Sequence, residues 1–417
     1  MVNSIIGSGI FGLPSLITRQ LGAAGPLAWI AAAVFSGIIM LCFAEVASRF
    51  TATGGPYLYA RVAFGRFTGI LMGWLTWLVR LASAAANANL FVIYLAEFWT
   101  RAQAPVSRVI VLTVLIGMVT LINYVGVNAG TQLSNVFTVA KLLPLLVFIA
   151  VGVIYLVGHH QSVHLGIANT GSGSWLDAML LMVFAYGGFE GALLPMGEAK
   201  DPRRDAPFAL MAALITCAVV YTLVQVVVMG VLANSAASDR PLATAAHVFM
   251  GGVGTAFISV GALLSIYGYL SSMILNTPRL TFALAEQGDF PQVFAAIHPR
   301  FRTPYFSILV FAALLWILAF TGSFQWNVVL SAVARLFYYG IVCAALIVLR
   351  RRSPGEARFR LPAGPVLAMI GIGMCMVFLT GMQRNAFYVL GVVALVAILN
   401  WLWANRRAPG MDSASAG

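Results

Sequence analysis

Charged residues are scarce in this sequence, because Asp, Glu, Lys and Arg together make up only 9% of its 417 residues. A soluble domain carries about 25% charged residues, so this chain lacks the polar surface that would face water on all sides. Hydrophobic residues make up 61% of the chain, and the mean hydropathy is +0.94. These values exclude an ordinary soluble multidomain protein and indicate a protein embedded in a membrane.

Cysteine and histidine are also few, with four and five residues. The cysteines all lie within apolar segments, none has the spacing of a metal ligand, and no predicted outer loop offers a pair, so we expect no disulfide. The histidines all fall in or beside predicted loops, whereas catalysis within the membrane would need a paired nucleophile and base or helical metal ligands. We therefore predict neither an enzyme nor a metal site, and the predicted function needs no cofactor.

Apolar runs of about 20 residues recur from end to end, each long enough to cross a bilayer as a helix. Their apolarity is uninterrupted, whereas the strands of a barrel would alternate. We predict an all-α polytopic membrane protein with about twelve transmembrane helices. The predicted spans are residues 1–20, 26–48, 67–98, 105–123, 134–157, 175–197, 206–232, 253–284, 304–321, 326–349, 364–381 and 386–404.

Basic residues are distributed unevenly between the predicted loops. With the N-terminus placed in the cytoplasm, most of the 24 Lys and Arg residues fall in inner loops and the tail. The outer loops hold only Arg19, Arg101, Arg108, Arg240 and Arg384, and three basic residues lie inside segments: Arg80, Lys141 and Arg335. This asymmetry follows the positive-inside rule with both termini cytoplasmic. The net charge of +12 therefore indicates topology, and we predict no binding of nucleic acid.

Two of the predicted segments are interrupted by glycine. The first contains Gly7, Gly9 and Gly12, and the sixth contains Gly187, Gly188 and Gly191. Paired glycine-interrupted segments in corresponding positions are typical of an inverted-repeat transporter. We predict a single integral domain over residues 1–404, followed by a short cytoplasmic tail at 405–417. Its repeats cover about 1–157 and about 175–349, and two further helices lie within 364–404.

The first three glycines also match the dinucleotide-binding pattern G-x-G-x-x-G. No strand precedes them, and no acidic residue follows where that pattern needs one to hold a ribose. A break inside a membrane helix instead points free N–H groups at an anion and free carbonyls at a cation. The carboxylate and ammonium of an amino acid suit such opposed half-helix ends, and the alternative is close helix packing through small residues.

Four stretches resemble the amino acid–polyamine–organocation (APC) transporter family. They are "IIGSGIFGLP" (first helix), "NVFTVAKLLPLL" (fifth), "FAYGGFEGALLPMGEAKDPRRDAP" (sixth helix and inner loop), and "NTPRLTFALAEQGDFP" with "HPRFRTPY" (end of the eighth helix and the loop beyond). The resemblance runs in order over nearly the whole chain. It implies a leucine-transporter-like inverted repeat of five plus five helices with two extra C-terminal helices, and alternating access around a site at mid-membrane.

The same resemblance implies which residues bind substrate. Ser8 and Gly9 would donate backbone N–H groups to the substrate carboxylate. The carbonyl of Ile5 would accept from the α-amine, together with the carbonyls of Phe184 and Gly187. Phe184 also falls where the family often has an aromatic gate, and packing against lipid or core is the alternative for its ring.

Lys141 and Glu190 are the predicted coupling residues. A lysine within an apolar helix usually faces a partner or a cavity, and in some APC members a fifth-helix lysine takes the place of a sodium ion. The Lys141 ammonium would then bond the carbonyls freed at Gly7–Gly9, either as a proton carrier or as a permanent structural charge, and snorkelling is the alternative. Glu190 lies where some members carry a proposed proton sensor, and a carboxylate fixed to helix-end amides is its alternative.

Two features depart from the family pattern. Arg80, in "TWLVRLASAAANAN", is not a family feature that we recognise, and it could pair with Glu190 or face the cavity and discourage cationic substrates. Only Met1 and Val2 precede Asn3, where the family has further apolar residues, which favours a misassigned start codon over an abbreviated inner gate.

We therefore expect a secondary active amino acid transporter of the cytoplasmic (inner) membrane, working by proton symport or exchange, with the amino acid, protons and the lipid bilayer as its partners. The rival within transport is a polyamine or cationic amino acid exchanger, which acidic residues at the site would favour. Glu45, Asp177 and Glu190 are the near candidates for such residues. The rival of another class is a transporter-like amino acid sensor, which a long soluble signalling domain would support, and the sequence shows none.

Overall fold

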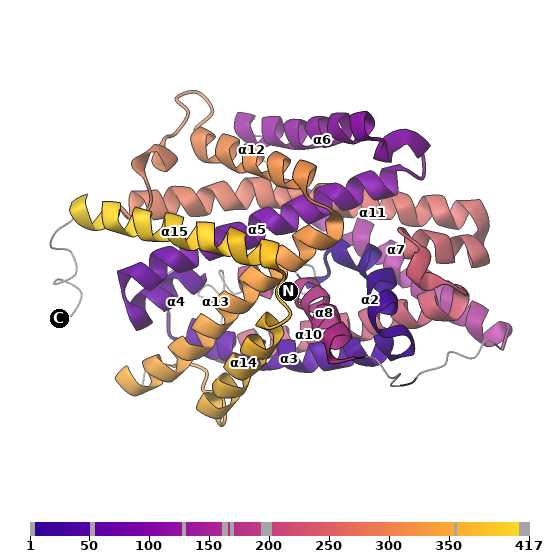
Figure 1. Ribbon diagram of the computed structural model, residues 1–417, viewed down its shortest axis with the longest axis horizontal. Coiled ribbons are helices and arrows are strands. Elements are labelled where there is room, and N and C mark those ends of the chain that lie inside the picture. The colour runs from indigo at the N-terminus through magenta and orange to yellow at the C-terminus, as the bar shows by residue number, and fades with distance from the viewer. Residues whose placement is uncertain are drawn as a thin grey trace.

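A computed structural model describes residues 5–50, 55–126, 131–160, 166, 171–192, 202–353 and 357–407 (Figure 1). Their regular structure consists of helices, with no strand among these residues. The α-helices are α2 (Leu13–Leu21), α3 (Gly25–Ala47), α4 (Gly55–Phe64), α5 (Arg66–Leu95), α6 (Pro105–Val125), α7 (Thr131–Gly158), α8 (Ser172–Ala185), α9 (Phe189–Ala192), α10 (Pro202–Val231), α11 (Pro241–Glu286), α12 (Tyr305–Thr321), α13 (Phe324–Arg352), α14 (Gly364–Leu379) and α15 (Arg384–Arg407).

Every predicted span contains helix, and the all-α polytopic fold class is confirmed. Within the described residues, eight helical stretches are long and apolar enough to cross a membrane, with α2 and α3 forming one of them. The shorter helices α12 and α14 are also apolar. The number of twelve transmembrane helices therefore stays a prediction.

The structure differs from the predicted spans at three places. The eighth span, predicted at 253–284, begins earlier because α11 starts at Pro241 and continues across a kink at Gly251 (φ 63°, ψ −157°), a conformation open to glycine. Helix α4 occupies a predicted loop, because Tyr57, Tyr59 and Ala60 bury one side of it. Helix α15 continues to Arg407, so part of the predicted tail is helical, and residues 408–417 lie outside the described part.

Helices α2 and α8 lie side by side near the centre of the molecule, with α3 beneath them, while α5, α6, α11 and α12 run along its long axis (Figure 1). Close approach is possible where small residues meet neighbouring helices. A Cβ atom at Gly261 of α11 would lie 2.5 Å from Cγ of Pro144 in α7. One at Gly12 would lie 2.8 Å from the Phe324 ring of α13. The start of α2 therefore packs tightly against α13.

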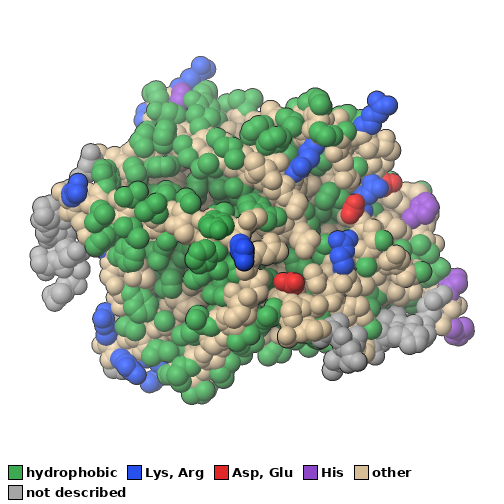
Figure 2. All heavy atoms as spheres, in the orientation of Figure 1, with side chains coloured by type: hydrophobic (Ala, Val, Ile, Leu, Met, Phe, Trp, Pro, Cys, Tyr) green, Lys and Arg blue, Asp and Glu red, His purple; other side chains and the backbone are tan. Residues whose placement is uncertain are grey.

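Hydrophobic side chains are spread over the face seen in Figure 2, and charged residues are scattered between them. Large apolar residues on α6, α7 and α10 are exposed, including Val114 (61%), Ile154 (71%) and Phe208 (73%). Such a surface is stable against lipid and not against water. These helices therefore form part of the outer, lipid-facing layer.

A buried cluster joins four elements at the predicted inner face. Asp289, which follows α11, is 0% exposed and accepts hydrogen bonds from Arg61 Nη1 (2.6 Å) and Arg66 Nε (2.8 Å). The Tyr57 hydroxyl also donates to this carboxylate, and Asn400 Nδ2 donates to the Asp289 carbonyl at 2.5 Å. Burial and the Asp289 charge raise the pKa of Tyr57, which keeps the phenol protonated as a donor. Asp289 thus ties α4, α5 and α15 to the end of α11.

A second buried carboxylate lies at the end of α3. Glu45 is 0% exposed and binds Arg350 Nε at 2.7 Å, Arg49 Nη2 at 3.3 Å and the Leu361 N–H at 2.9 Å. Buried carboxylates need such partners, and here they join α3 to α13 and to the chain before α14. Glu45 therefore has a packing role between helices.

Candidate substrate site at two helix breaks

The first break begins at Gly7. Its backbone is extended (φ −94°, ψ 178°), a short 3₁₀ helix covers Ser8–Phe11, and α2 starts at Leu13. The first N–H groups of a helix have no hydrogen-bond partner within that helix. The backbone N–H groups of Ser8 and Gly9 are of this kind, because these residues begin the 3₁₀ helix that precedes α2. Only the backbone of Ser8 is described, and its side chain lies outside the described part.

The second break follows α8. Tyr186, Gly187 and Gly188 form a turn, and Gly188 has φ 105°, a value that favours glycine. The N–H of Gly188 donates to Glu190 Oε2 at 2.9 Å, and the N–H of Gly187 donates to the Phe184 carbonyl at 3.2 Å. Glu190 therefore lies at the start of α9 with one oxygen held by a helix-end amide.

Phe184 brings the two breaks together. A Cβ atom at Gly9 would lie 2.9 Å from Cε1 of the Phe184 ring, so the ring rests on the Gly9 backbone. The side chain of Phe184 is buried, with 9% exposure. The ring therefore covers the helix start where the sequence predicts a carboxylate site.

Tyr221 of α10 links both breaks and is not among the site residues predicted from the sequence. Its hydroxyl lies 3.0 Å from the Ile5 carbonyl and 3.2 Å from the Ala185 carbonyl, so one proton is shared between two helix ends. One turn further along α10, the buried Gln225 accepts from Trp29 Nε1 at 3.0 Å. A polar pair at i and i+4 within the apolar sequence "YTLVQVV" was the signal that could have found them.

Lys141 of α7 lies at the first break. Its ammonium donates to the Ile6 carbonyl over 2.6 Å, and the side chain is half-buried. Ile6 itself is 1% exposed and directly precedes the extended Gly7. A cation at this point neutralises the negative end of the segment before the break, as at any helix C-terminus.

Arg335 of α13 occupies the second break, although the sequence predicted no role for it. The side chain is 6% exposed, its Nη2 lies 3.5 Å from Glu190 Oε1, and its Nη1 donates to the Phe184 carbonyl at 3.3 Å. A Cβ atom at Gly187 would be 1.2 Å from Nη1, so the guanidinium fills the space above that glycine. The Phe184 carbonyl was predicted to accept a hydrogen bond from the substrate amine. In the structure it already accepts one from the Arg335 guanidinium. A charged residue within an apolar segment was the signal for Arg335.

Arg80 of α5 does not pair with Glu190, whose ion pair is with Arg335. Among the described residues, Arg80 makes neither a hydrogen bond nor an ion pair, and its side chain is half-buried. Of the three acidic candidates, Glu190 stands at the breaks, while Glu45 belongs to the cluster with Arg350. Positive charge therefore exceeds negative charge around the second break.

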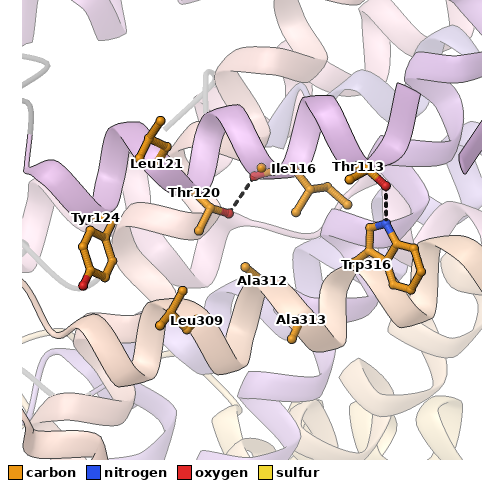
Figure 3. A pocket seen from close by; sticks show the side chains of 10 residues that line it. Thr113, Ile116, Thr120, Leu121, Tyr124, Leu309, Ala312, Ala313 and Trp316 are labelled. Carbon is orange, nitrogen blue, oxygen red and sulfur yellow. Dashed lines mark hydrogen bonds between the residues drawn. The ribbon is translucent and has the colours of Figure 1, made fainter. Parts of the chain in front are cut away.

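A separate groove of about 650 Å³ lies between α6 and α12 (Figure 3). Its ends are marked by Tyr124 and by Trp316, whose Nε1 donates to Thr113 Oγ1 at 2.9 Å. Its walls are mostly apolar and contain none of the break residues. Within the described part of the chain, no group of three His, Cys, Asp or Glu side chains is placed to hold a metal ion.

The sequence profile of the amino acid permease family matches residues 1–402. The chain belongs to this family. The chain is 27% identical to the methylthioribose transporter of Bacillus subtilis (strain 168), over 98% of this chain and 92% of that protein. From the same organism, the branched-chain amino acid permease BcaP is 25% identical (96% and 88% covered) and the serine/threonine exchanger SteT is 27% identical (94% and 88%).

This membership confirms the resemblance to APC transporters and identifies the chain as a multi-pass membrane transporter by family. All three relatives are named as transporters, permeases or exchangers. The family alone does not assign the roles of individual residues at the breaks.

Proposed function

We propose that this protein is a secondary active amino acid transporter that binds its substrate between the two helix breaks and works by alternating access. The contact between Phe184 and Gly9 is the observation that carries the proposal, because it brings a helix start and a helix end to one place. A helix start attracts an anion and a helix end attracts a cation, which matches the two charged groups of an amino acid.

The substrate carboxylate binds the backbone N–H groups of Ser8 and Gly9. Gly9 lacks a side chain, so an anion can approach its backbone, and the Phe184 ring closes the site on one side. Movement of this ring is then needed for entry or release, which makes Phe184 a gate. An apolar cover also strengthens hydrogen bonds to the carboxylate by excluding water.

The substrate ammonium binds the carbonyls of Ile5, Phe184 and Gly187. In the structure Ile5 accepts from Tyr221 and Phe184 accepts from Arg335, so neither carbonyl is bare. A carbonyl oxygen has two lone pairs, and an ammonium can share it or displace the earlier donor. Substrate binding is thus expected to shift the Arg335 guanidinium away from Gly187.

Lys141 is proposed to stabilise the first break as a bound cation would. The 2.6 Å bond to Ile6 supports this role, because loss of the ammonium would leave a buried carbonyl without that donor. Glu190 is proposed as the second coupling group. A proton gradient acting on Lys141 or Glu190, or substrate exchange, drives the cycle. We also propose the inner membrane as the location, with both termini cytoplasmic.

The relatives do not fix the substrate, since their names cover branched-chain amino acids, serine and threonine, and methylthioribose. Methylthioribose has neither a carboxylate nor an ammonium, so it would not use opposed helix ends in the same way. A polyamine or cationic amino acid is disfavoured by the positive charges of Arg80 and Arg335 beside a single carboxylate, Glu190. Amino acid uptake therefore fits the breaks better than these rivals.

Uptake into proteoliposomes tests the proposal. The purified protein is assayed with a panel of labelled amino acids, putrescine and methylthioribose, with and without internal substrate and with and without an inward proton gradient. Saturable uptake of an amino acid supports the proposal, and its dependence on internal substrate or on the gradient separates exchange from symport. Uptake of putrescine or methylthioribose alone, or saturable amino acid binding without any uptake, contradicts it.

A further inference from the structure

We propose that the substrate is an amino acid with a side-chain carboxylate, and that Arg80 and Arg335 bind that carboxylate across the packed helices α5 and α13. This inference rests on the proposed transport function and narrows it to acidic amino acids. The sequence left Arg80 with two roles, a pair with Glu190 or the exclusion of cationic substrates, and gave Arg335 none.

The packing of α5 on α13 places the two arginines within about one helical turn of each other. Ser331 donates from Oγ to the Val79 carbonyl (3.2 Å) and hydrogen-bonds to Ser83 Oγ (2.7 Å). The helices are antiparallel, because Arg352 at the end of α13 donates to the carbonyl of Ala63, just before α5. Arg80 directly follows Val79, and Arg335 lies one helical turn beyond Ser331.

The guanidinium groups have more donors than the surrounding protein satisfies. Arg335 uses Nη1 on the Phe184 carbonyl and Nη2 on Glu190, but its Nε is buried without a hydrogen-bond partner. Arg80 makes no hydrogen bond or ion pair with the described residues. A buried unpaired donor such as Arg335 Nε is costly away from water and indicates that an acceptor belongs there, while Arg80 is only half-buried.

The charges are also unbalanced. Two arginines face one carboxylate, Glu190, and one of its oxygens already accepts from the Gly188 N–H. Uncompensated charge within a membrane is expensive, and such residues usually mark a substrate pathway. A substrate that brings one negative charge would balance the second arginine.

A carboxylate is the group that fits these donors. Guanidinium and carboxylate are planar and form paired, charge-assisted hydrogen bonds. Arg335 touches the second break at Gly187 and Phe184, so a side chain leaving the proposed backbone site reaches it directly. The α-carboxylate would bind at Ser8 and Gly9, and the side-chain carboxylate would bind between α5 and α13.

The test compares each acid with its amide, because the two have nearly the same shape. Proteoliposomes are assayed for uptake of labelled L-glutamate, L-glutamine, L-aspartate, L-asparagine and L-arginine. We expect kcat/KM for glutamate or aspartate to exceed that of its amide by roughly tenfold or more, as the loss of a charged hydrogen bond predicts, and we expect no uptake of arginine.

Variants assign the effect to residues. Arg80→Gln should lower the preference for the acid over its amide by roughly tenfold or more, while it leaves amide uptake measurable. Arg335→Gln combined with Glu190→Gln removes a charge pair together. Because this variant also removes the proposed coupling group, it is compared by substrate binding to the purified protein, where it should lose the preference for the acid over its amide. Arg384→Gln, an exposed arginine at the start of α15, is the matched control and should leave the preference unchanged. Size-exclusion profiles check that each variant is folded.

The two possible failures are distinguishable. If the wild-type protein transports glutamine, asparagine or arginine as well as or better than the acids, this inference is wrong while amino acid transport stands. If the Arg80→Gln variant keeps the wild-type preference for the acid, the carboxylate does not bind Arg80, and the inference is again wrong. If no amino acid is transported, the proposed function itself fails.

Discussion

The hydroxyl group of Tyr221 donates a hydrogen bond of 3.0 Å to the carbonyl oxygen of Ile5. The same hydroxyl lies 3.2 Å from the Ala185 carbonyl, so a residue of α10 joins the end of the segment before the first break to the end of α8. Its ring packs against Tyr186 and Trp29, with ring centres 5.4 Å and 5.1 Å apart. The two breaks are therefore held together by a third helix.

Replacing Tyr221 by Phe removes the hydroxyl and keeps the ring packing. We expect uptake to fall by roughly tenfold, because an unsatisfied buried carbonyl costs about 1–3 kcal/mol. Uptake in proteoliposomes measures the effect, and Tyr388→Phe is the control, since that tyrosine is 67% exposed on α15. Wild-type uptake by the Tyr221→Phe variant would show that the link between the breaks is not needed.

Replacing Lys141 by Ala should reduce uptake by roughly tenfold or more, because the Ile6 carbonyl loses its donor. Leu143→Ala on the same helix, at a position 51% exposed, is the control. If Lys141 acts only as a positive charge, Lys141→Arg restores part of the uptake. If Lys141 carries the coupled proton, the Lys141→Arg variant should lose uptake driven by a pH gradient and retain substrate exchange, because arginine does not release its proton.

Two assays separate the two roles of Lys141. One measures uptake driven by a pH gradient, and the other measures substrate exchange at equal pH on both sides. Unchanged activity of Lys141→Ala in both assays would rule out both roles. Coupling would then have to be sought at Glu190 or in pure exchange.

Replacing Gly187 by Ala should abolish most of the uptake. The new Cβ would lie 1.2 Å from Arg335 Nη1, so the guanidinium must leave the Phe184 carbonyl and Glu190. Gly191→Ala is a matched control, because a Cβ there meets no atom within 4 Å. If both variants transport at the wild-type rate, the position of Arg335 over Gly187 has no part in transport.

Replacing Asp289 by Asn should lower the thermal unfolding midpoint of the detergent-solubilised protein. The substitution leaves Arg61 and Arg66 without their carboxylate, and breaking a buried ion pair costs about 3–5 kcal/mol. Asp239→Asn, at an exposed position, should leave the midpoint unchanged. An equal midpoint for wild type and Asp289→Asn would mean that this cluster does not stabilise the fold.

Much of the fold follows from local properties of the sequence. Apolar runs locate the helices, and the glycines at 7–12 and 187–191 locate the two breaks, because both signals act over neighbouring residues. The kink at Gly251 was not predicted, because the neighbouring Gly251 and Gly252 indicated the end of the apolar span and not a helix that continues through them. Helix α4 was missed because its burial comes from contacts with distant residues, such as Tyr57 with Asp289.

The site was less predictable than the fold. Sequence shows that Arg335 and Tyr221 lie within apolar helices, but not which neighbour each side chain meets. The partners of Arg335 are on α8 and α9, about 150 positions earlier in the chain, where only the packing of α13 on α8 brings them close. Lys141 was easier, because the family resemblance supplied its partner near Gly7.

Substrate binding by Gly9→Val tests most directly whether the amino acid binds at the helix breaks. A valine Cβ would meet the Phe184 ring at 2.9 Å and block the backbone N–H groups, while Gly391→Val adds the same side chain where no atom lies within 4 Å. The probe is the labelled amino acid with the fastest uptake, measured on purified, monodisperse protein by scintillation proximity. We predict saturable binding by the wild type and Gly391→Val and none by Gly9→Val. Wild-type affinity in a monodisperse Gly9→Val protein would contradict the proposed site.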